Sequence, residues 1–188
     1  FNDFKYVVEL LEQAAEDPGV LAIKITIYRL AKNSRITTAL LKAAENGKNV
    51  SVLFEVTARF DEENNIKEAQ RLQKAGCFVI YGFNKYKTHT KLMLIVRKNS
   101  NDSITRYVHM SSGNYNEDTA RLYTDISLLS TNEMYAQDIS EFFNVITGHS
   151  EPGDYQNIIT APGDMRRKLI ELIENEAVNA RAGKPSGI

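Results

Sequence analysis

The segment Lys87-Thr88-His89-Thr90-Lys91 carries the residue types most able to do chemistry. His89 and Lys91 are two positions apart at the predicted start of a strand, so both side chains are expected on one face. An imidazole nitrogen can attack phosphorus and hold a phosphoryl group, while a lysine ammonium offsets the charge on its oxygens. A His-x-Lys triplet is common by chance, however, and a lone histidine is more often structural or at the surface.

Two further features suit a phosphate. The segment Ser111-Ser112-Gly113-Asn114-Tyr115-Asn116 predicts a turn of small polar residues, whose hydroxyl, amide and backbone N–H groups could cradle an anion. Arg29 and Arg59 follow two successive predicted strands, whose ends meet at one crevice in an α/β sheet. Guanidinium groups match phosphate oxygens. Each feature alone has an ordinary explanation, a plain turn or a surface ion pair. Their convergence with His89 favours a phosphate site.

The other reactive side chains have weaker claims. His109 lies in a predicted strand and is interpreted as a core histidine, and His149 follows a helix end and is assigned to the surface. Tyr123 could stack on a base or simply pack against a strand. Cys77, the single cysteine, precedes an apolar run and is predicted to be a small buried residue without a disulfide.

Composition places these residues in an ordinary globular domain. The 188 residues are 43% hydrophobic and 25% charged, which is enough for one core. The 23 basic and 24 acidic residues give a balance unlike that of a nucleic-acid-binding protein. No apolar run approaches the length of a membrane span and no signal peptide is recognisable, so we expect a cytoplasmic protein without a membrane span. Because the sequence starts at Phe1 without Met, we expect a piece of a longer protein.

Hydrophobic periodicity predicts alternating helices and strands in the first half of the chain. The expected elements are a helix at 4–15, a strand at 20–28, a helix capped by Ser34 and ending at Gly47, a strand at 50–56, a helix at 61–75 and a strand at 77–81. Such alternation favours a sheet covered by helices on both faces.

The second half predicts a different pattern. Strands at 91–96 and 104–110 are separated by a polar turn, which is typical of a hairpin. A further strand is expected at 120–129, then a helix capped by Thr131 and ending at Gly148, and a last amphipathic helix at 164–182. The fold class expected is therefore α/β, with a mixed sheet flanked by helices on both faces.

Several sequence strings together resemble the type-1 polyphosphate kinases. They cover nearly the whole chain in register: Asp17-Pro18, Ala22-Ile23-Lys24, Tyr28-Arg29, Ala58-Arg59-Phe60-Asp61-Glu62-Glu63-Asn64-Asn65-Ile66, Lys87-Thr88-His89-Thr90-Lys91, Gly113-Asn114-Tyr115-Asn116, Thr119-Ala120-Arg121-Leu122-Tyr123-Thr124-Asp125 and Gly183-Lys184-Pro185-Ser186-Gly187-Ile188.

The resemblance implies a function for each candidate. His89 would be a phosphohistidine nucleophile that moves the terminal phosphate of ATP to inorganic polyphosphate or back, with Lys91 beside it. Tyr123 matches a nucleotide-contacting tyrosine, and Gly113 and Asn114 would help to bind the phosphates. The resemblance assigns Arg29 and Arg59 to a phosphate and magnesium site. A guanidinium cannot ligate Mg²⁺, so that contact is expected through phosphate oxygens or water.

The family's catalytic domains resemble phospholipase D, in which two His-x-Lys sites face one another. This chain carries one such motif and has Val96 where the superfamily motif has an aspartate. We therefore expect residues 1–160 to be a phospholipase-D-like catalytic domain, and residues 161–188 to lead into a second domain with the partner histidine. The piece alone is expected to lack kinase turnover. The longer protein is expected to be a homo-oligomer, either cytoplasmic or peripheral at the inner membrane.

Two alternatives stay open at the level of sequence. A phosphodiesterase of the phospholipase D type would use the same histidine on a diester. A non-catalytic phosphate-binding or dimerisation module would bind polyphosphate without labelling a histidine. Glu55 and Asp125, near predicted strand ends, are the candidates for a carboxylate that orients His89.

Overall fold

The structure, a computed structural model, describes residues 3–55, 62–82, 87–148 and 153–188. Along the chain the elements are α1 (Lys5–Glu16), β1 (Val20–Ile27), α2 (Arg35–Glu45), β2 (Asn49–Phe54), α3 (Glu62–Lys74), β3 (Phe78–Tyr81), β4 (Leu92–Lys98), β5 (Ile104–Ser111), the 3₁₀ turn η1 (Thr119–Arg121), β6 (Ser127–Ser130), α4 (Glu133–Ile146) and α5 (Met165–Arg181).

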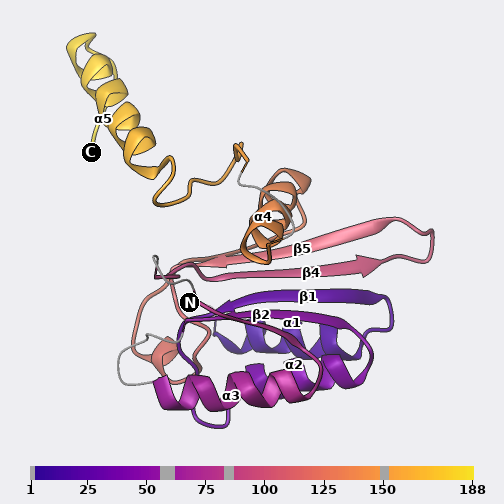
Figure 1. Cartoon of the computed structure of the whole chain (residues 1–188). Helices are drawn as coiled ribbons and strands as arrows, with labels where there is room; N and C mark the ends of the chain where they lie inside the picture. The colour runs from indigo at the N-terminus through magenta and orange to yellow at the C-terminus, as the bar shows by residue number, and fades with distance from the viewer. Residues whose placement is uncertain (1–2, 56–61, 83–86, 149–152) are drawn as a thin grey trace. The chain divides into compact units, whose positions relative to one another are not determined.

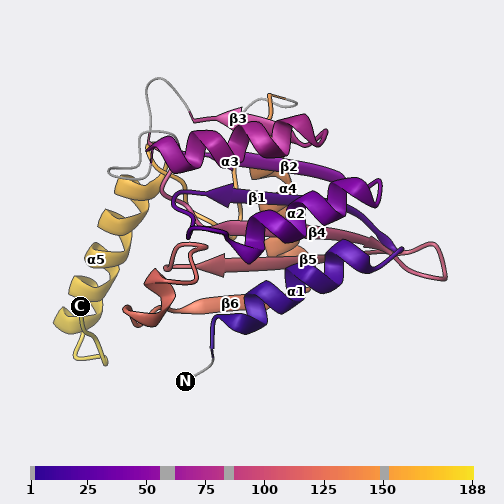
Figure 2. The same cartoon turned by 90° about the horizontal axis from the view of Figure 1, so that it is seen from below.

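The strands of the described residues form one six-stranded sheet in the order β3-β2-β1-β4-β5-β6. β1, β2 and β3 are parallel, whereas β4, β5 and β6 each run antiparallel to the strand before them in the sheet. Helices α1, α2 and α3 cover one face and α4 covers the other (Figures 1 and 2). The predicted fold class, a mixed sheet with helices on both faces, is confirmed.

Local sequence explains most of these elements. β1 is β-branched and almost entirely apolar, as expected for a central strand covered on both faces. Ser34 begins α2, since its side-chain oxygen accepts a hydrogen bond from the backbone N–H of Ile36 at 3.1 Å. The hairpin predicted between residues 91 and 110 is present as β4 and β5.

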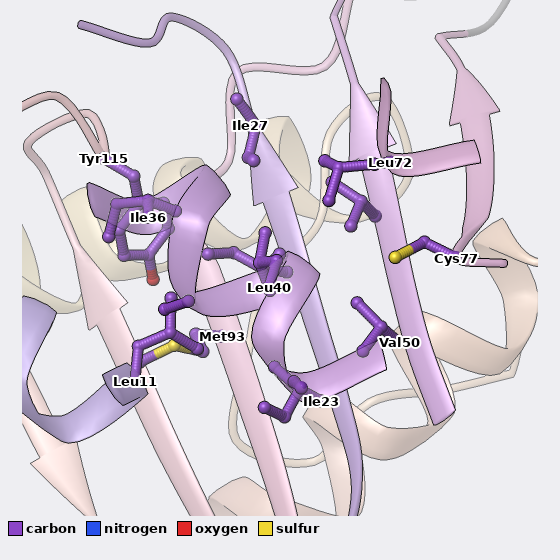
Figure 3. Close-up of a cluster of buried hydrophobic side chains, with 14 of the residues drawn as sticks. Leu11, Ile23, Ile27, Ile36, Leu40, Val50, Leu72, Cys77, Met93 and Tyr115 are labelled. Atoms are coloured by element: carbon purple, nitrogen blue, oxygen red, sulfur yellow. The ribbon is translucent and has the colours of Figure 1, made fainter. Parts of the chain in front are cut away.

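Two apolar clusters hold the layers together. The larger lies between the sheet and α1, α2 and α3 (Figure 3), and the smaller lies between α4 and the strands β4 and β5. Cys77 is buried in the larger cluster, as predicted, and burial raises the pKa of its thiol to about 11. Tyr115 also enters that cluster from the turn after β5, beside Ile36 (Figure 3).

The strand predicted over 120–129 is wrong for most of its length. Pairing with β5 begins only at Ser127, which lies opposite Ser111. Upstream, the Asn116 side chain accepts hydrogen bonds from the backbone N–H groups of Asp118 and Thr119, at 3.0 and 2.9 Å. These bonds form a turn directly before the 3₁₀ turn η1, which takes the place of the first residues of the predicted strand.

The cap predicted for the next helix is displaced by one residue. Asn132, not Thr131, is the N-cap of α4, because its side-chain oxygen accepts from the backbone N–H of Met134 at 2.9 Å. Asn132 has extended backbone angles, as N-cap residues usually do, so the helix begins one position later than the threonine indicated.

The chain divides into two compact units, residues 1–152 and 153–188. The first contains the whole sheet and both apolar clusters. The second contains α5, none of whose described residues is buried. Among the described residues, no helix combines the length and apolar character that crossing a membrane requires.

Candidate active site

Strand direction brings most of the predicted site residues to one end of the sheet. The parallel strands β1 and β2 end there, and β5 ends there too (Figure 2), while β4 and β6 begin there because they run antiparallel to their neighbours. Arg29 therefore follows β1, His89 and Lys91 precede β4, and Gly113 and Asn114 follow β5. The carboxyl ends of the parallel strands are where α/β proteins usually bind ligands.

His89 and Lys91 form a contacting pair. The side chain of His89 is exposed, whereas Lys91 is only 5% exposed. The Lys91 ammonium nitrogen lies 3.0 Å from His89 Nδ1 and also donates to the His89 carbonyl oxygen. The predicted meeting of an imidazole and a cation on one face is therefore present, with the imidazole open to an incoming group.

Burial shifts both pKa values downward, and neighbouring positive charge lowers that of His89 further. The pKa of His89 is lowered by burial first and then by the positive charges of Lys91 and Lys87, so its imidazole is neutral at neutral pH. Burial lowers the pKa of Lys91 to about 8, although the negative charge of Asp125 acts in the opposite direction. A neutral imidazole is the form that has a lone pair for nucleophilic attack.

The His89 segment is fixed by hydrogen bonds from β1 and β2. Thr26 on β1 donates its hydroxyl to the carbonyl of Thr90 at 2.9 Å and accepts the backbone N–H of Leu92 at 3.0 Å. Glu55, buried just after β2, accepts the backbone N–H of Thr88 at 2.7 Å. These contacts hold the backbone on both sides of His89, and the role of Thr26 had no signal in the sequence.

Tyr28 is a site residue that sequence reasoning missed. Its ring packs edge-on against the His89 imidazole, with centroids 5.0 Å apart and an interplanar angle of 67°. The ammonium groups of Lys87 and Lys91 lie 5.5 and 5.3 Å from the centre of the Tyr28 ring. Its position at the end of a buried strand, directly before Arg29, was the available signal.

The turn after β5 is held against Asp125. Gly113 donates its backbone N–H to the Ser111 hydroxyl at 2.9 Å, and Ser112 donates its hydroxyl to Asp125 at 3.0 Å. A Cβ atom on Gly113 would lie 2.3 Å from a carboxylate oxygen of Asp125, so a side chain at this position would force the carboxylate to move. Asp125 therefore links this turn to Lys91, because its negative charge raises the pKa of Lys91.

Below this turn, His109 and Tyr115 form a buried pair. His109 Nδ1 lies 2.9 Å from the Tyr115 hydroxyl, and the two rings are tilted with centroids 5.6 Å apart. Burial lowers the pKa of His109 to about 4. The histidine is therefore a neutral core residue, in agreement with its predicted structural role.

Tyr123 lies apart from the imidazole. It is 69% exposed, in the segment between η1 and β6. It lines a groove of about 970 Å³ between the first turns of α1 and this segment. Gly113, Asn114 and Asp125 line the same groove, whereas His89 and Lys91 are absent from its lining among the described residues. The groove therefore connects Tyr123 with the predicted phosphate-binding turn.

The predicted phosphate and magnesium site lies only partly within the described residues. Arg29 is half-buried after β1, whereas Arg59 and His149 lie outside the described residues. In the described part of the chain, no cluster of three or more His, Cys, Asp or Glu side chains could hold a metal ion.

Comparison with known proteins shows the family to which this chain belongs. The family model described as Polyphosphate kinase C-terminal domain 1 matches residues 1–152. The chain belongs to the polyphosphate kinase family. The polyphosphate kinase of Thermosynechococcus vestitus is 50% identical over 100% of this chain and 26% of that protein. The Escherichia coli polyphosphate kinase is 47% identical over 100% of this chain and 27% of that protein. The chain thus spans about a quarter of the length of these relatives.

Solved structures agree with the family and the fold. The polyphosphate kinase of Porphyromonas gingivalis superposes with a TM-score of 0.83 at 38% identity, over 96% of this chain and 30% of that one. A phospholipase D family member from Salmonella typhimurium superposes with a TM-score of 0.56 at 16% identity, over 76% of this chain and 88% of that one. The second likeness concerns the fold alone, and it confirms the phospholipase-D-like architecture predicted for this polyphosphate kinase domain.

Proposed function

We propose that this chain is the part of a polyphosphate kinase that carries its phosphoryl-accepting histidine, His89. The observation that carries the proposal is the contact between an exposed imidazole and a nearly buried lysine at the end of the sheet where the parallel strands β1 and β2 finish. Transfer of the terminal phosphate of ATP to inorganic polyphosphate, and its reversal, would pass through His89. Family membership and 47% identity to the polyphosphate kinase of Escherichia coli support this assignment.

The proposed chemistry has two displacements at phosphorus. In the first, a lone pair of the neutral imidazole forms an N–P bond with the terminal phosphorus of ATP, the bond to the bridging oxygen breaks, and ADP leaves. In the second, a terminal oxygen of polyphosphate attacks the same phosphorus and the N–P bond breaks. Lys91 would balance charge on the phosphoryl oxygens in both steps.

The choice of imidazole nitrogen follows from Lys91. An ammonium can only donate, so a charged Lys91 at Nδ1 leaves the proton of a neutral ring on Nε2. Attack by Nε2 therefore requires the proton to move to Nδ1 and Lys91 to turn toward the phosphoryl oxygens. Binding and proton transfer are coupled in this scheme.

The remaining candidates bind the substrates in this proposal. Gly113 and Asn114 would contact phosphates through the turn, and Tyr123 would contact the nucleotide from the adjoining groove. Arg29, with Arg59, would bind phosphate oxygens. Magnesium would neutralise and orient the nucleotide phosphates, held by them and by water rather than by an arginine.

Part of the site belongs to the longer protein in this proposal. Residues 1–160 would be the first catalytic domain, and residues 161–188 would lead into a second one that supplies the partner histidine. The 188-residue chain alone would then show no sustained polyphosphate synthesis. Measurable ATP-dependent synthesis by this chain would contradict that part of the proposal.

The direct test is labelling with γ-labelled ATP and magnesium in a full-length protein carrying this sequence. We expect acid-labile, base-stable label on the peptide that contains His89, and its loss in His89→Ala. His149→Gln is the matched control, because the sequence assigns His149 to the surface and the label on His89 should then remain. Undiminished label in His89→Ala would refute the assignment.

The fold likeness to a phospholipase D family member favours one alternative, a phosphodiesterase that uses the same nucleophile. Hydrolysis of a chromogenic phosphodiester that disappears in His89→Ala, together with no label from ATP, would favour it over the kinase.

A further inference from the structure

The ring of Tyr28 contacts both members of the His89–Lys91 pair at once. It packs edge-on to the His89 imidazole at 5.0 Å and lies 5.3 Å from the Lys91 ammonium nitrogen, measured to the Tyr28 ring centre. The Lys87 ammonium lies 5.5 Å from the same centre. The face of an aromatic ring is electronegative, so it attracts such cations. One side chain thus lies against the imidazole and two of the ammonium groups beside it.

The backbone of Tyr28 is itself fixed. Asn65, fully buried on α3, donates its side-chain amide to the Tyr28 carbonyl at 2.9 Å and to the Glu55 carbonyl at 3.2 Å. Thr26, two residues before Tyr28, holds the backbone of Thr90 and Leu92. The ring therefore projects from a rigid strand end onto a segment that the same strand anchors.

We infer that Tyr28 is a positioning residue, whose aromatic ring holds the imidazole of His89 and the ammonium of Lys91 in their relative places. The ring, rather than the hydroxyl, is what the contacts require, because the Tyr28 hydroxyl makes no hydrogen bond among the described residues. The consequence for phosphoryl transfer rests on the proposed function, whereas the positioning itself concerns only this chain.

The variants Tyr28→Phe and Tyr28→Leu distinguish the contribution of the aromatic ring from that of the hydroxyl. The readout is the titration of the His89 ring, followed by NMR in the 188-residue chain. Among the described residues, the charged groups that face the His89 ring are Lys87 and Lys91, and burial is the largest cause of the lowered pKa of His89. Tyr28→Phe keeps the aromatic ring that covers the imidazole and should leave the pKa of His89 unchanged. Tyr28→Leu removes most of this covering surface, so the pKa of His89 should rise toward its ordinary value.

Tyr81→Leu is the matched control. Tyr81 ends β3 at the same end of the sheet, but it is exposed, its hydroxyl bonds to Gln73, and no contact of its ring with His89 is present among the described residues. This substitution should leave the titration of His89 as in the unsubstituted chain. A shift equal to that of Tyr28→Leu would show a general effect of losing a tyrosine and would overturn the inference.

Two further outcomes would overturn it. One is an unchanged His89 titration in a folded Tyr28→Leu chain, and the other is a Tyr28→Phe chain that shifts as much as Tyr28→Leu. If Tyr28→Leu does not fold, the unsubstituted chain decides, because nuclear Overhauser effects between the Tyr28 and His89 ring protons are expected and their absence contradicts the contact. None of these readouts needs phosphoryl transfer, so failure to label His89 from ATP would refute the proposed function and leave this result standing.

Discussion

At the scale of single residues, two lowered pKa values set the pH range in which His89 can act. His89 needs its neutral form, so phosphoryl uptake should fall as the pH drops below its pKa, which lies below 6.5. Lys91 needs its charged form to balance phosphate oxygens, so uptake should also fall as the pH rises through about 8.

The pH dependence of His89 labelling in a full-length protein is therefore expected to be bell-shaped. Bound ATP should move the alkaline limb to higher pH, because its negative charge favours the lysine ammonium. Lys91→Arg keeps its charge at every accessible pH and should remove the alkaline limb, even if the rate is lower. An alkaline limb retained unchanged in Lys91→Arg would contradict the assignment to Lys91.

Also at the residue scale, the contact between Gly113 and Asp125 makes a prediction about charge. In Gly113→Ala the new Cβ would displace the Asp125 carboxylate, which it would otherwise approach to 2.3 Å. Asp125 raises the pKa of Lys91, so its displacement should lower that pKa below about 8.

The measurement is an NMR titration of the Lys91 side chain in the 188-residue chain. Gly153→Ala is the matched control, since a Cβ there meets nothing within 4 Å. It should leave the Lys91 titration unaltered. Equal titration curves for Gly113→Ala and the unsubstituted chain would mean that Asp125 does not act on Lys91.

At the scale of elements, the start of α4 gives a direct comparison between two adjacent residues. Asn132 caps the helix through the backbone N–H of Met134, whereas Thr131 precedes the cap. Asn132→Ala should lower the free energy of unfolding by about 1 kcal/mol. Thr131→Ala should change it by less than about 0.5 kcal/mol. Urea unfolding of the two variants measures the difference, and a larger loss for Thr131→Ala would reverse the assigned cap.

At the scale of the whole molecule, stability is concentrated in the first compact unit. Both apolar clusters lie within residues 1–152, and α5 in the second unit buries none of its described side chains. A chain shortened to residues 1–152 should therefore keep the thermal midpoint of the 188-residue chain to within about 2 °C, because it loses little buried apolar surface. Circular dichroism melting of the two chains tests this, and a fall of many degrees would show that the second unit stabilises the first.

The sequence by itself determined the pattern of elements and the candidate nucleophile. Apolar periodicity and turn residues are local signals, so the alternation of helices and strands, the Ser34 cap and the hairpin were all predictable. The pairing of His89 with Lys91 followed from their spacing alone, since residues two apart on a strand share a face. The resemblance to a family then gave those residues a chemistry.

Only the tertiary structure decided which distant residues meet His89. Tyr28, Thr26 and Asp125 come from three other segments, and they join the site because of strand order, direction and register. The wrong strand over residues 120–126 has the same origin, since Asn116 starts a turn there in place of sheet pairing. Contacts of this kind depend on residues far apart in the chain or on competing hydrogen bonds, which periodicity does not encode.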